Sequence, residues 1–296
     1  MIDNTEERGD HMPSIQCEVL APAGRMSDIA PLIEVGADAI YVGLSGYSAR
    51  PRSSDFTVDE VMEALEVVHK AKRKLFVAVN ANVPGERYEE LAESIKTLDA
   101  AGVDAVIISD YGLIHYLSKI IVNMEIHVST LAGVYNYRDV EMLKEMGVKR
   151  IIFSSDLFVD EMVDMIDHVP DLDYEIVADG GICFNSNRQC QLPHVGQKEQ
   201  YTVFCQMDYE LYKDEERLGP AKRIGNCPGK LHRTMGIYLG MGIKSFKIEG
   251  RTNAFSYILQ RVKSVVDSKK FTLENDRDIP GMMHYIRRST WYGQNN

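Results

Sequence analysis

The chain has 296 residues, of which 45% are hydrophobic and 26% charged, and its formal net charge at pH 7 is −11. These values are typical of a soluble globular protein, and a chain of this length buries a core without help from disulfide bonds. No run of 18 apolar residues occurs, so we expect no membrane-spanning helix and no membrane partner. The acidic balance argues against sequence-independent binding to nucleic acid or anionic lipid, which rewards a positive surface.

The N-terminal segment, residues 1–14, is polar and carries few apolar side chains. It lacks the apolar core of a secretory signal. We expect it to be a disordered leader or the remnant of an expression tag, and we expect residues 15–296 to form a single domain. Without a secretory signal, the cysteines are expected in the reducing cytoplasm, where thiols bind metals or do chemistry rather than pair.

From residue 18 onward, short β-rich runs alternate with runs of helical period. The expected strands are Glu18–Ala21, Ala39–Gly43, Leu75–Val79, Ala105–Ser109, Glu125–Ser129, Arg150–Ser154, Tyr174–Ala178 and Ser245–Glu249. The expected helices are Asp28–Val35, Val58–Ala71, Tyr88–Ala101, Arg138–Met146 and Val159–Ile166. Several strands are nearly continuous apolar runs, as in parallel strands that are buried on both faces.

Four helix–strand joints share one pattern, in which a glycine is followed by an apolar residue: they begin at Val35, Ala101, Met146 and Met241. The glycine ends the helix in the left-handed conformation, and the apolar residue docks on the core. Eight such strands predict an α/β fold, a (β/α)8 barrel of the TIM-barrel type, with a doubly wound open sheet as the alternative. In a barrel, the loops that follow the strands form the active face.

Four cysteines, Cys183, Cys190, Cys205 and Cys227, lie in an unusually long connection between the seventh and eighth strands. Four thiols in one stretch are enough to hold an iron–sulfur cluster. Their spacings are C-x6-C, C-x14-C and C-x21-C, without the C-x2-C pair of a zinc ribbon. Spacing alone leaves a cluster, zinc and unrelated thiols all open. Cys17, before the first strand, is expected to be a buried inert thiol.

Polar residues end several of the strands. Asn80, Ser129, Asp179, Glu249 and Arg251 each follow a predicted strand or close it. Any one of them could serve as an ordinary cap or turn residue. As a set on one face of a barrel, we expect them to line a shared pocket and to be the catalytic residues.

Several segments resemble peptidase family U32. They are Leu20-Ala-Pro-Ala-Gly24, Gly36–Gly43, Asn80, His127-Val-Ser-Thr130 and, most specifically, Phe246-Lys-Ile-Glu-Gly-Arg251. The signature of the family, a Glu before a Gly-small-apolar-Cys with a second Cys seven positions on, is matched by Glu175, Gly180, Ile182, Cys183 and Cys190. Its flanking positions differ at Val177, Gly181, Arg188 and Pro193. The resemblance runs from about residue 18 to residue 265.

The resemblance implies a barrel with a [4Fe–4S] cluster on Cys183, Cys190, Cys205 and Cys227. It also implies oxygen-independent hydroxylation of an aromatic small molecule or a nucleobase, with prephenate as the source of the hydroxyl group. Many members of the family have an extra C-terminal domain, which we expect to be absent here because the sequence ends soon after its last predicted strand. A possible partner is a second copy of this chain in a homodimer, or another U32 protein in a heterodimer.

The partners expected from the sequence are small molecules: a prephenate-like donor and an acceptor. Because prephenate is a dicarboxylate, cations and amides should bind it, and Arg50 and Arg52 are the candidates in the loop after the second strand. The net charge of −11 makes nucleic acid an unlikely but not excluded partner. Basic residues such as Lys222 and Arg223 could form a local groove, although scattered solvated charge is the simpler interpretation.

Two other classes of function stay open. A peptidase would need a nucleophile beside a base, and the chain offers His127 and Ser129 but no His-Glu-x-x-His motif and no nucleophile elbow. A non-catalytic iron–sulfur subunit that works only with a partner is the third possibility. The sequence does not identify the molecule that is hydroxylated.

Overall fold

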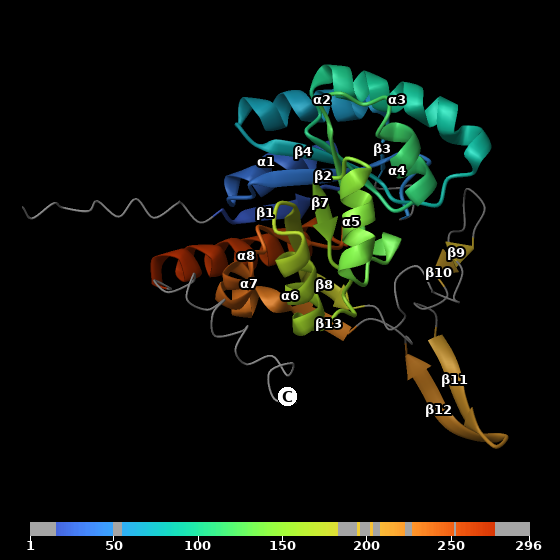
Figure 1. Ribbon diagram of the computed structural model, residues 1–296. Helices are drawn as coiled ribbons and strands as arrows, with labels where there is room; N and C mark the ends of the chain where they lie inside the picture. Colours follow the sequence, from blue (N-terminus) through green and yellow to red (C-terminus); the bar gives the residue numbers. More distant parts are fainter. Residues whose placement is uncertain are drawn as a thin grey trace, which may run out of the picture.

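Eight parallel strands form a closed barrel (Figure 1). The computed structural model describes residues 16–49, 55–182, 194–195, 202–203, 208–222, 227–251 and 253–275. The barrel strands are β1 (Glu18–Pro22), β2 (Ala39–Leu44), β4 (Lys74–Val79), β5 (Ala105–Ile108), β6 (Glu125–Val128), β7 (Arg150–Ile152), β8 (Asp173–Ile182) and β14 (Ser245–Ile248). They are hydrogen-bonded in the order β1-β14-β8-β7-β6-β5-β4-β2, and β2 pairs with β1 again. This closure confirms the predicted barrel and excludes the open sheet.

Helices cover the outside of the barrel (Figure 1). They are α1 (Met26–Glu34), α2 (Val58–Lys70), α3 (Tyr88–Ala101), α4 (Tyr111–Leu117), α5 (Tyr137–Glu145), α6 (Val159–His168), α7 (Met235–Met241) and α8 (Phe255–Asn275). The sequence predicted five of these and missed α4, α7 and α8. In the part of the chain that the structure describes, none of the helices is long and apolar enough to cross a membrane.

The four predicted helix–strand joints have the expected geometry. Gly36, Gly102, Gly147 and Gly242 all have positive φ angles, between 87° and 106°. The apolar residue after each glycine donates its backbone N–H to a carbonyl five residues earlier, as Val103 does to Leu98 at 3.0 Å. These bonds satisfy carbonyl groups that the end of a helix leaves open.

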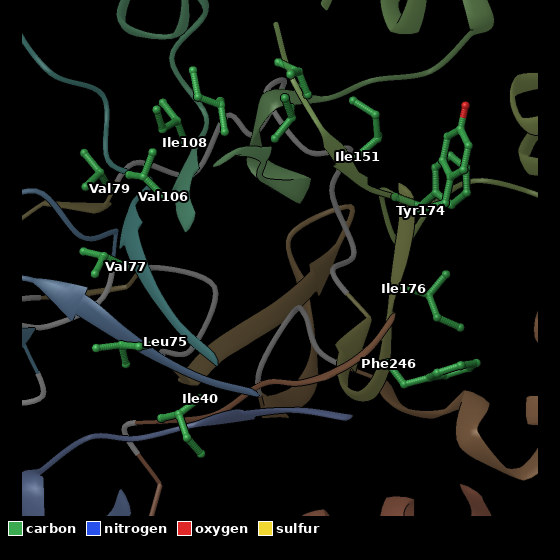
Figure 2. Close-up of a cluster of buried hydrophobic side chains, with 14 of the residues drawn as sticks. Ile40, Leu75, Val77, Val79, Val106, Ile108, Ile151, Tyr174, Ile176 and Phe246 are labelled. Atoms are coloured by element: carbon green, nitrogen blue, oxygen red, sulfur yellow. The ribbon is translucent and has the colours of Figure 1, made fainter. Parts of the chain in front are cut away.

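The core has two layers. Side chains on the outer face of the strands pack against the helices, and Figure 2 shows them pointing away from the ring of strands. A smaller cluster fills the inside of the barrel: Leu20, Ala39, Tyr41, Phe76, Ala78, Ala105, Ile107 and Ile152. Alternate residues of each strand therefore face the helices and the barrel interior.

The connection between β8 and β14 contains further short strands. They are β9 (His194–Val195), β10 (Thr202–Val203), β11 (Asp208–Lys213), β12 (Glu216–Lys222) and β13 (Cys227–Lys230). The strands β11 and β12 form an antiparallel hairpin that stands off the barrel (Figure 1). β13 returns to the barrel and pairs antiparallel with β8. β3 (Asp55–Phe56) pairs with the carboxyl end of β2. The prediction of one domain over residues 15–296 stays a prediction.

Candidate active site at the carboxyl ends of the strands

The five predicted catalytic residues all lie at the carboxyl ends of barrel strands. Asn80 follows β4, Ser129 follows β6, Asp179 is near the end of β8, and Glu249 and Arg251 follow β14. The predicted substrate-binding residues Arg50 and Arg52 lie outside the described residues, and so do Cys183, Cys190 and Cys205.

Asn80 and Ser129 each accept a backbone hydrogen bond at the rim of the barrel. The Oδ1 atom of Asn80 accepts a hydrogen bond from the backbone N–H of Ala49 at 3.0 Å. Ala49 directly precedes Arg50, so Asn80 anchors the segment that leads to the two predicted arginines. The Oγ atom of Ser129 accepts the N–H of Leu131 at 3.2 Å and caps the short 3-10 helix η3 (Thr130–Ala132). The structure gives both side chains a positioning role at the mouth of the barrel.

Asp179 faces the helix layer. The register of β14 against β8 shifts between Lys247 and Ile248, so that Lys247 pairs with Val177 but Ile248 pairs with Asp179. The carboxylate of Asp179 accepts hydrogen bonds from Arg261 on α8, with its Oδ1 atom 2.7 Å from Nε and 2.6 Å from Nη2. Its other oxygen lies 3.6 Å from His232 Nδ1, and burial lowers the pKa of this histidine. Asp179 therefore ties α8 to the end of β8, just before the cysteine segment.

Arg251 reaches across the barrel mouth toward β2 and β3. Its side chain is buried, with Nη2 against Ser48 Oγ and 3.5 Å from Asp55 Oδ1. Gly43 leaves the space that the guanidinium occupies, because a Cβ atom there would overlap both Arg251 and Asp55. Glu249 turns the other way, since its side chain lies against Gly180 on β8. Glu249 and Arg251 thus serve opposite sides of the mouth.

The barrel interior holds a buried charge network that the sequence analysis missed. Arg150 Nη1 lies 2.6 Å from Glu18 Oε1 and 3.1 Å from Glu175 Oε2. The hydroxyl of Ser245 donates to the same two carboxylates, at 2.9 and 3.0 Å. Lys247 Nζ lies 3.4 Å from Glu175 Oε1. A signal was present in the sequence: Glu175 and Lys247 stand between apolar residues within their strands, and Glu18, Arg150 and Ser245 begin theirs.

The charges of the network shift each other's pKa. Burial alone would lower the pKa of the Arg150 guanidinium. The negative charges of Glu175 and Glu18 outweigh burial, so the pKa is raised. Burial alone would raise the pKa of Glu175, yet Lys247 and Arg150 outweigh it and the pKa is lowered. For Lys247 burial is the largest effect, and it lowers the pKa of the amine.

A cavity of about 100 Å³ lies beside the end of β8, between β7, α6 and α7. Its lining is mostly apolar with a few small polar groups: Phe153, Ser154, Ser155, Leu157, Val159, Met162, Ile176, Val177, Gly180, Leu231 and Tyr238. Gly180 stands three positions before Cys183. An apolar cavity with a few polar groups is the common form of a small-molecule site, and this one lies at the end of β8, the strand that leads to Cys183.

One cysteine of the predicted set, Cys227, lies among the described residues. In the pairing of β13 with β8, Cys227 stands opposite Ile182, the residue directly before Cys183. Partners in an antiparallel pair have Cα atoms about 5 Å apart, so Cys227 lies beside the strand that leads to Cys183. Among the described residues there is no group of three His, Cys, Asp or Glu side chains that could hold a metal ion. The other three cysteines of the set lie outside those residues.

Cys17 is separate from this segment and buried, as expected. Its thiol contacts the sulfur of Met235 at 3.8 Å. Burial raises the pKa of Cys17 to about 12. Because the thiolate is the form that binds metal, Cys17 is a poor ligand.

Comparison with known proteins identifies similar sequences over most of the chain. The sequence pattern of peptidase family U32 matches residues 24–283. The tRNA hydroxylation protein P of Helicobacter pylori (strain J99) is 30% identical over 270 residues, which cover 84% of this chain and 63% of that protein. The tRNA hydroxylation protein P2 of Bacillus subtilis (strain 168) is 26% identical, with 87% of each chain covered. The 23S rRNA 5-hydroxycytidine C2501 synthase of Escherichia coli (strain K12) is 27% identical over 83% of this chain and 38% of its own length.

These relatives overturn one prediction. The sequence analysis expected a small-molecule acceptor and considered nucleic acid unlikely, but the relatives are named for tRNA and rRNA hydroxylation. The physical reason for the error is that a net charge of −11 sums residues over the whole surface. RNA binding depends on the cations at the contact, which the sum does not report. The chain spans less than two thirds of the Helicobacter pylori relative, 63% of its length.

Proposed function

Because the chain belongs to peptidase family U32, we propose that it acts in the hydroxylation of a nucleobase in RNA. The observation that carries the proposal is the similarity to proteins named for tRNA and rRNA hydroxylation, which covers more than four fifths of this chain. The family match covers residues 24–283, which include most of the barrel and the cysteine segment.

The proposed cofactor is a [4Fe–4S] cluster on Cys183, Cys190, Cys205 and Cys227. The register that places Cys227 opposite Ile182 supports a shared group, and the burial of Cys17, which raises the pKa of its thiol, argues against that thiol as a ligand. When bound, a cluster would supply the redox chemistry that ordinary side chains lack.

The chain's own residues would position the substrates. Enzymes that modify a base take it out of the stack into a fitted pocket. The cavity beside Gly180 is the proposed pocket for the base, because it is apolar and lies at the end of β8, the strand that leads into the cysteine segment. The proposed donor is prephenate or a similar dicarboxylate, which Arg50 and Arg52 would bind. Asn80 would hold their loop in place through its bond to Ala49.

The peptidase alternative finds no support at His127 and Ser129. His127 is fully buried, and its Nε2 atom lies 3.0 Å from Glu125. Ser129 instead accepts the backbone N–H of Leu131. A nucleophile and its base must share a hydrogen bond, and these contacts do not include one.

The first experiment concerns the cluster. The protein is purified without oxygen, and iron and acid-labile sulfide are counted per chain. We expect about four of each, as in one [4Fe–4S] cluster. Replacing any of Cys183, Cys190, Cys205 or Cys227 by Ala should remove the cluster, while Cys17→Ala should keep it. Full iron content in Cys205→Ala or Cys227→Ala would contradict the four-ligand set.

The second experiment concerns the acceptor. The protein is expressed in a bacterial strain that lacks its own U32 hydroxylation proteins, and nucleosides from tRNA and rRNA are analysed by mass spectrometry. We expect a hydroxylated pyrimidine that is absent without the gene. Ser155→Phe should abolish it at unchanged iron content, because the new ring fills the cavity from a partly exposed position.

Ser118→Phe is the matched control for this experiment. Ser118 lines a different cavity, together with Glu125 and Lys149 at the amino ends of β6 and β7. The control should leave the modification intact. Loss of the modification in both variants, or in neither, would exclude the cavity beside Gly180 as the pocket for the base.

A further inference from the structure

An exposed aromatic residue borders the cavity beside Gly180. Phe158 stands between Leu157 and Val159, which both line the cavity, and it is 74% exposed. Its backbone N–H donates to Glu161 Oε2 at 2.7 Å, which fixes the chain where α6 begins. A single exposed aromatic residue is ordinary on a protein surface, but this one lies beside the proposed pocket for a base. RNA-binding modules stack unpaired bases on aromatic side chains in this kind of position.

Two cations border the same cavity from the side of β13 and α7. Lys230 is the last residue of β13, and Arg233 lies in the 3-10 helix η5 (Leu231–Thr234) that follows. Both are exposed, and Leu231, which lies between them in the sequence, lines the cavity. Lys230 stands opposite Asp179 in the pairing of β13 with β8, but that carboxylate pairs with α8 and η5 side chains instead. Among the described residues, neither cation forms an ion pair, so both charges are available to a ligand.

The two borders of the cavity differ in charge. Asp156 and Asp160 are exposed on either side of Phe158 in the sequence, so the border at α6 is acidic and repels a phosphate group. The border at η5 carries Lys230 and Arg233 and attracts one. A nucleic acid strand that lies over the cavity is therefore oriented, with its bases toward α6 and its phosphates toward η5. This local pair of cations also shows how a chain with a net charge of −11 can meet RNA.

We propose that single-stranded RNA crosses the mouth of this cavity, with a base next to the modified one stacked on Phe158 and the adjoining phosphates bound by Lys230 and Arg233. The inference rests on the proposed function, because it takes the cavity as the pocket for the modified base. An unpaired loop fits this surface best, since its bases are free to stack on a side chain and leave the stack at little cost. Ring and cations contact features that every nucleotide has, so the choice of base falls to the cavity lining.

The test measures RNA binding by the full chain, purified without oxygen. The probe is fluorescently labelled bulk tRNA from a strain that lacks its own U32 hydroxylation proteins, and anisotropy gives the binding constant over a series of salt concentrations. Phe158→Ala should weaken binding about tenfold, because one stacked base is lost, and should leave the salt dependence unchanged. Phe158→Trp should restore the affinity, since it keeps an aromatic ring at this position.

The two cations should alter the salt dependence instead. In Lys230→Gln and in Arg233→Gln, the slope of the logarithm of the binding constant against the logarithm of the salt concentration should become shallower by about 0.7, the value for one phosphate contact on a single strand. Two exposed residues away from the cavity provide matched controls. Phe271→Ala, near the carboxyl end of α8, and Lys119→Gln, between α4 and β6, should bind as the wild type does.

The outcomes separate this inference from its alternatives. Wild-type affinity and slope in Phe158→Ala, Lys230→Gln and Arg233→Gln, equal losses in the controls, or no binding of tRNA by the wild type would each overturn it. Sedimentation tests whether the ring contacts a second copy of the chain: a dimer that Phe158→Ala dissociates, with unchanged tRNA affinity, would also overturn it. Binding as expected without a hydroxylated nucleoside would refute the proposed function alone. Hydroxylation with binding that none of the three variants changes would refute this inference alone.

Discussion

At the scale of single residues, the carboxyl end of β14 shows how one glycine and one arginine close the barrel mouth. Gly43 leaves room for the guanidinium of Arg251, which pairs with Asp55 across that space. The sequence analysis expected Arg251 to be a catalytic residue that lines a shared pocket. Its contacts with Ser48 and Asp55 also give it a structural role, because they join the end of β14 to the segment around β2 and β3.

We therefore predict that Arg251→Met lowers the free energy of unfolding by roughly 3–5 kcal/mol, the usual cost of leaving a buried partner charge unpaired. Asp55, whose side chain is 1% exposed, would be that charge. Urea denaturation measures the change. Arg138→Met is the control, because Arg138 pairs with Glu141 on the surface of α5 and should contribute little. An unchanged unfolding free energy with lost substrate binding would instead assign Arg251 to the substrate.

Glu175 and Lys247 show what the sequence could and could not reveal at this scale. Charged and apolar residues alternate in Phe246–Glu249, a pattern that indicates one face toward the helices and one toward the barrel interior. It did not reveal that Glu175 would be shared by Arg150, Ser245 and Lys247, because these residues come from strands far apart in the sequence. Such pairings depend on barrel closure and strand register, which a local pattern does not contain.

At the scale of the elements, the barrel strands were predictable because they contain short apolar runs, and four of them follow a glycine stop. All eight lie within a few residues of their expected bounds. The helix α7 was missed because its sequence, Met235-Gly-Ile-Tyr-Leu-Gly-Met241, carries two glycines and is buried on most sides, so it lacks an amphipathic period.

The direction of Asp179 was not predictable for a different reason. Strict alternation along β8 would place its side chain inside the barrel with Glu175 and Val177. The register shift opposite Ile248 turns it toward Arg261 and His232 instead. Bulges of this kind re-aim a side chain at the rim of a barrel, and no residue type marks them. The cysteine set remains a prediction, since only Cys227 and the residues before Cys183 are described.

At the scale of the whole molecule, net charge was the least informative of the sequence properties. It correctly described an acidic protein but led to the wrong class of partner. A site of a few residues decides which ligand binds, whereas −11 is the sum over 296 residues. Family membership, which rests on specific short segments such as Phe246–Arg251, was the better guide to function.

The stability of the whole barrel should fall on mild acidification because of its buried histidines. His127 is fully buried, and burial lowers its pKa, against the opposing effect of Glu125. Burial also lowers the pKa of His232. In the unfolded chain both would titrate near pH 6.5. Below that pH the unfolded chain takes up protons that the folded chain does not bind, so stability is lost as the pH falls.

We predict that the free energy of unfolding decreases between pH 7 and pH 5, with a limiting slope of about 1.4 kcal/mol per pH unit for each such histidine. Glu175, whose pKa is lowered, acts in the same direction but only near and below its ordinary pKa, about 4.3, so the histidines control this window. Urea denaturation at pH 7, 6 and 5 measures the slope. His127→Gln should reduce it, whereas His115→Gln, at an exposed position on α4, should not. Equal slopes in the two variants would show that His127 takes up its proton in the folded barrel. The charge network around Arg150 would then be less isolated from water than its burial implies.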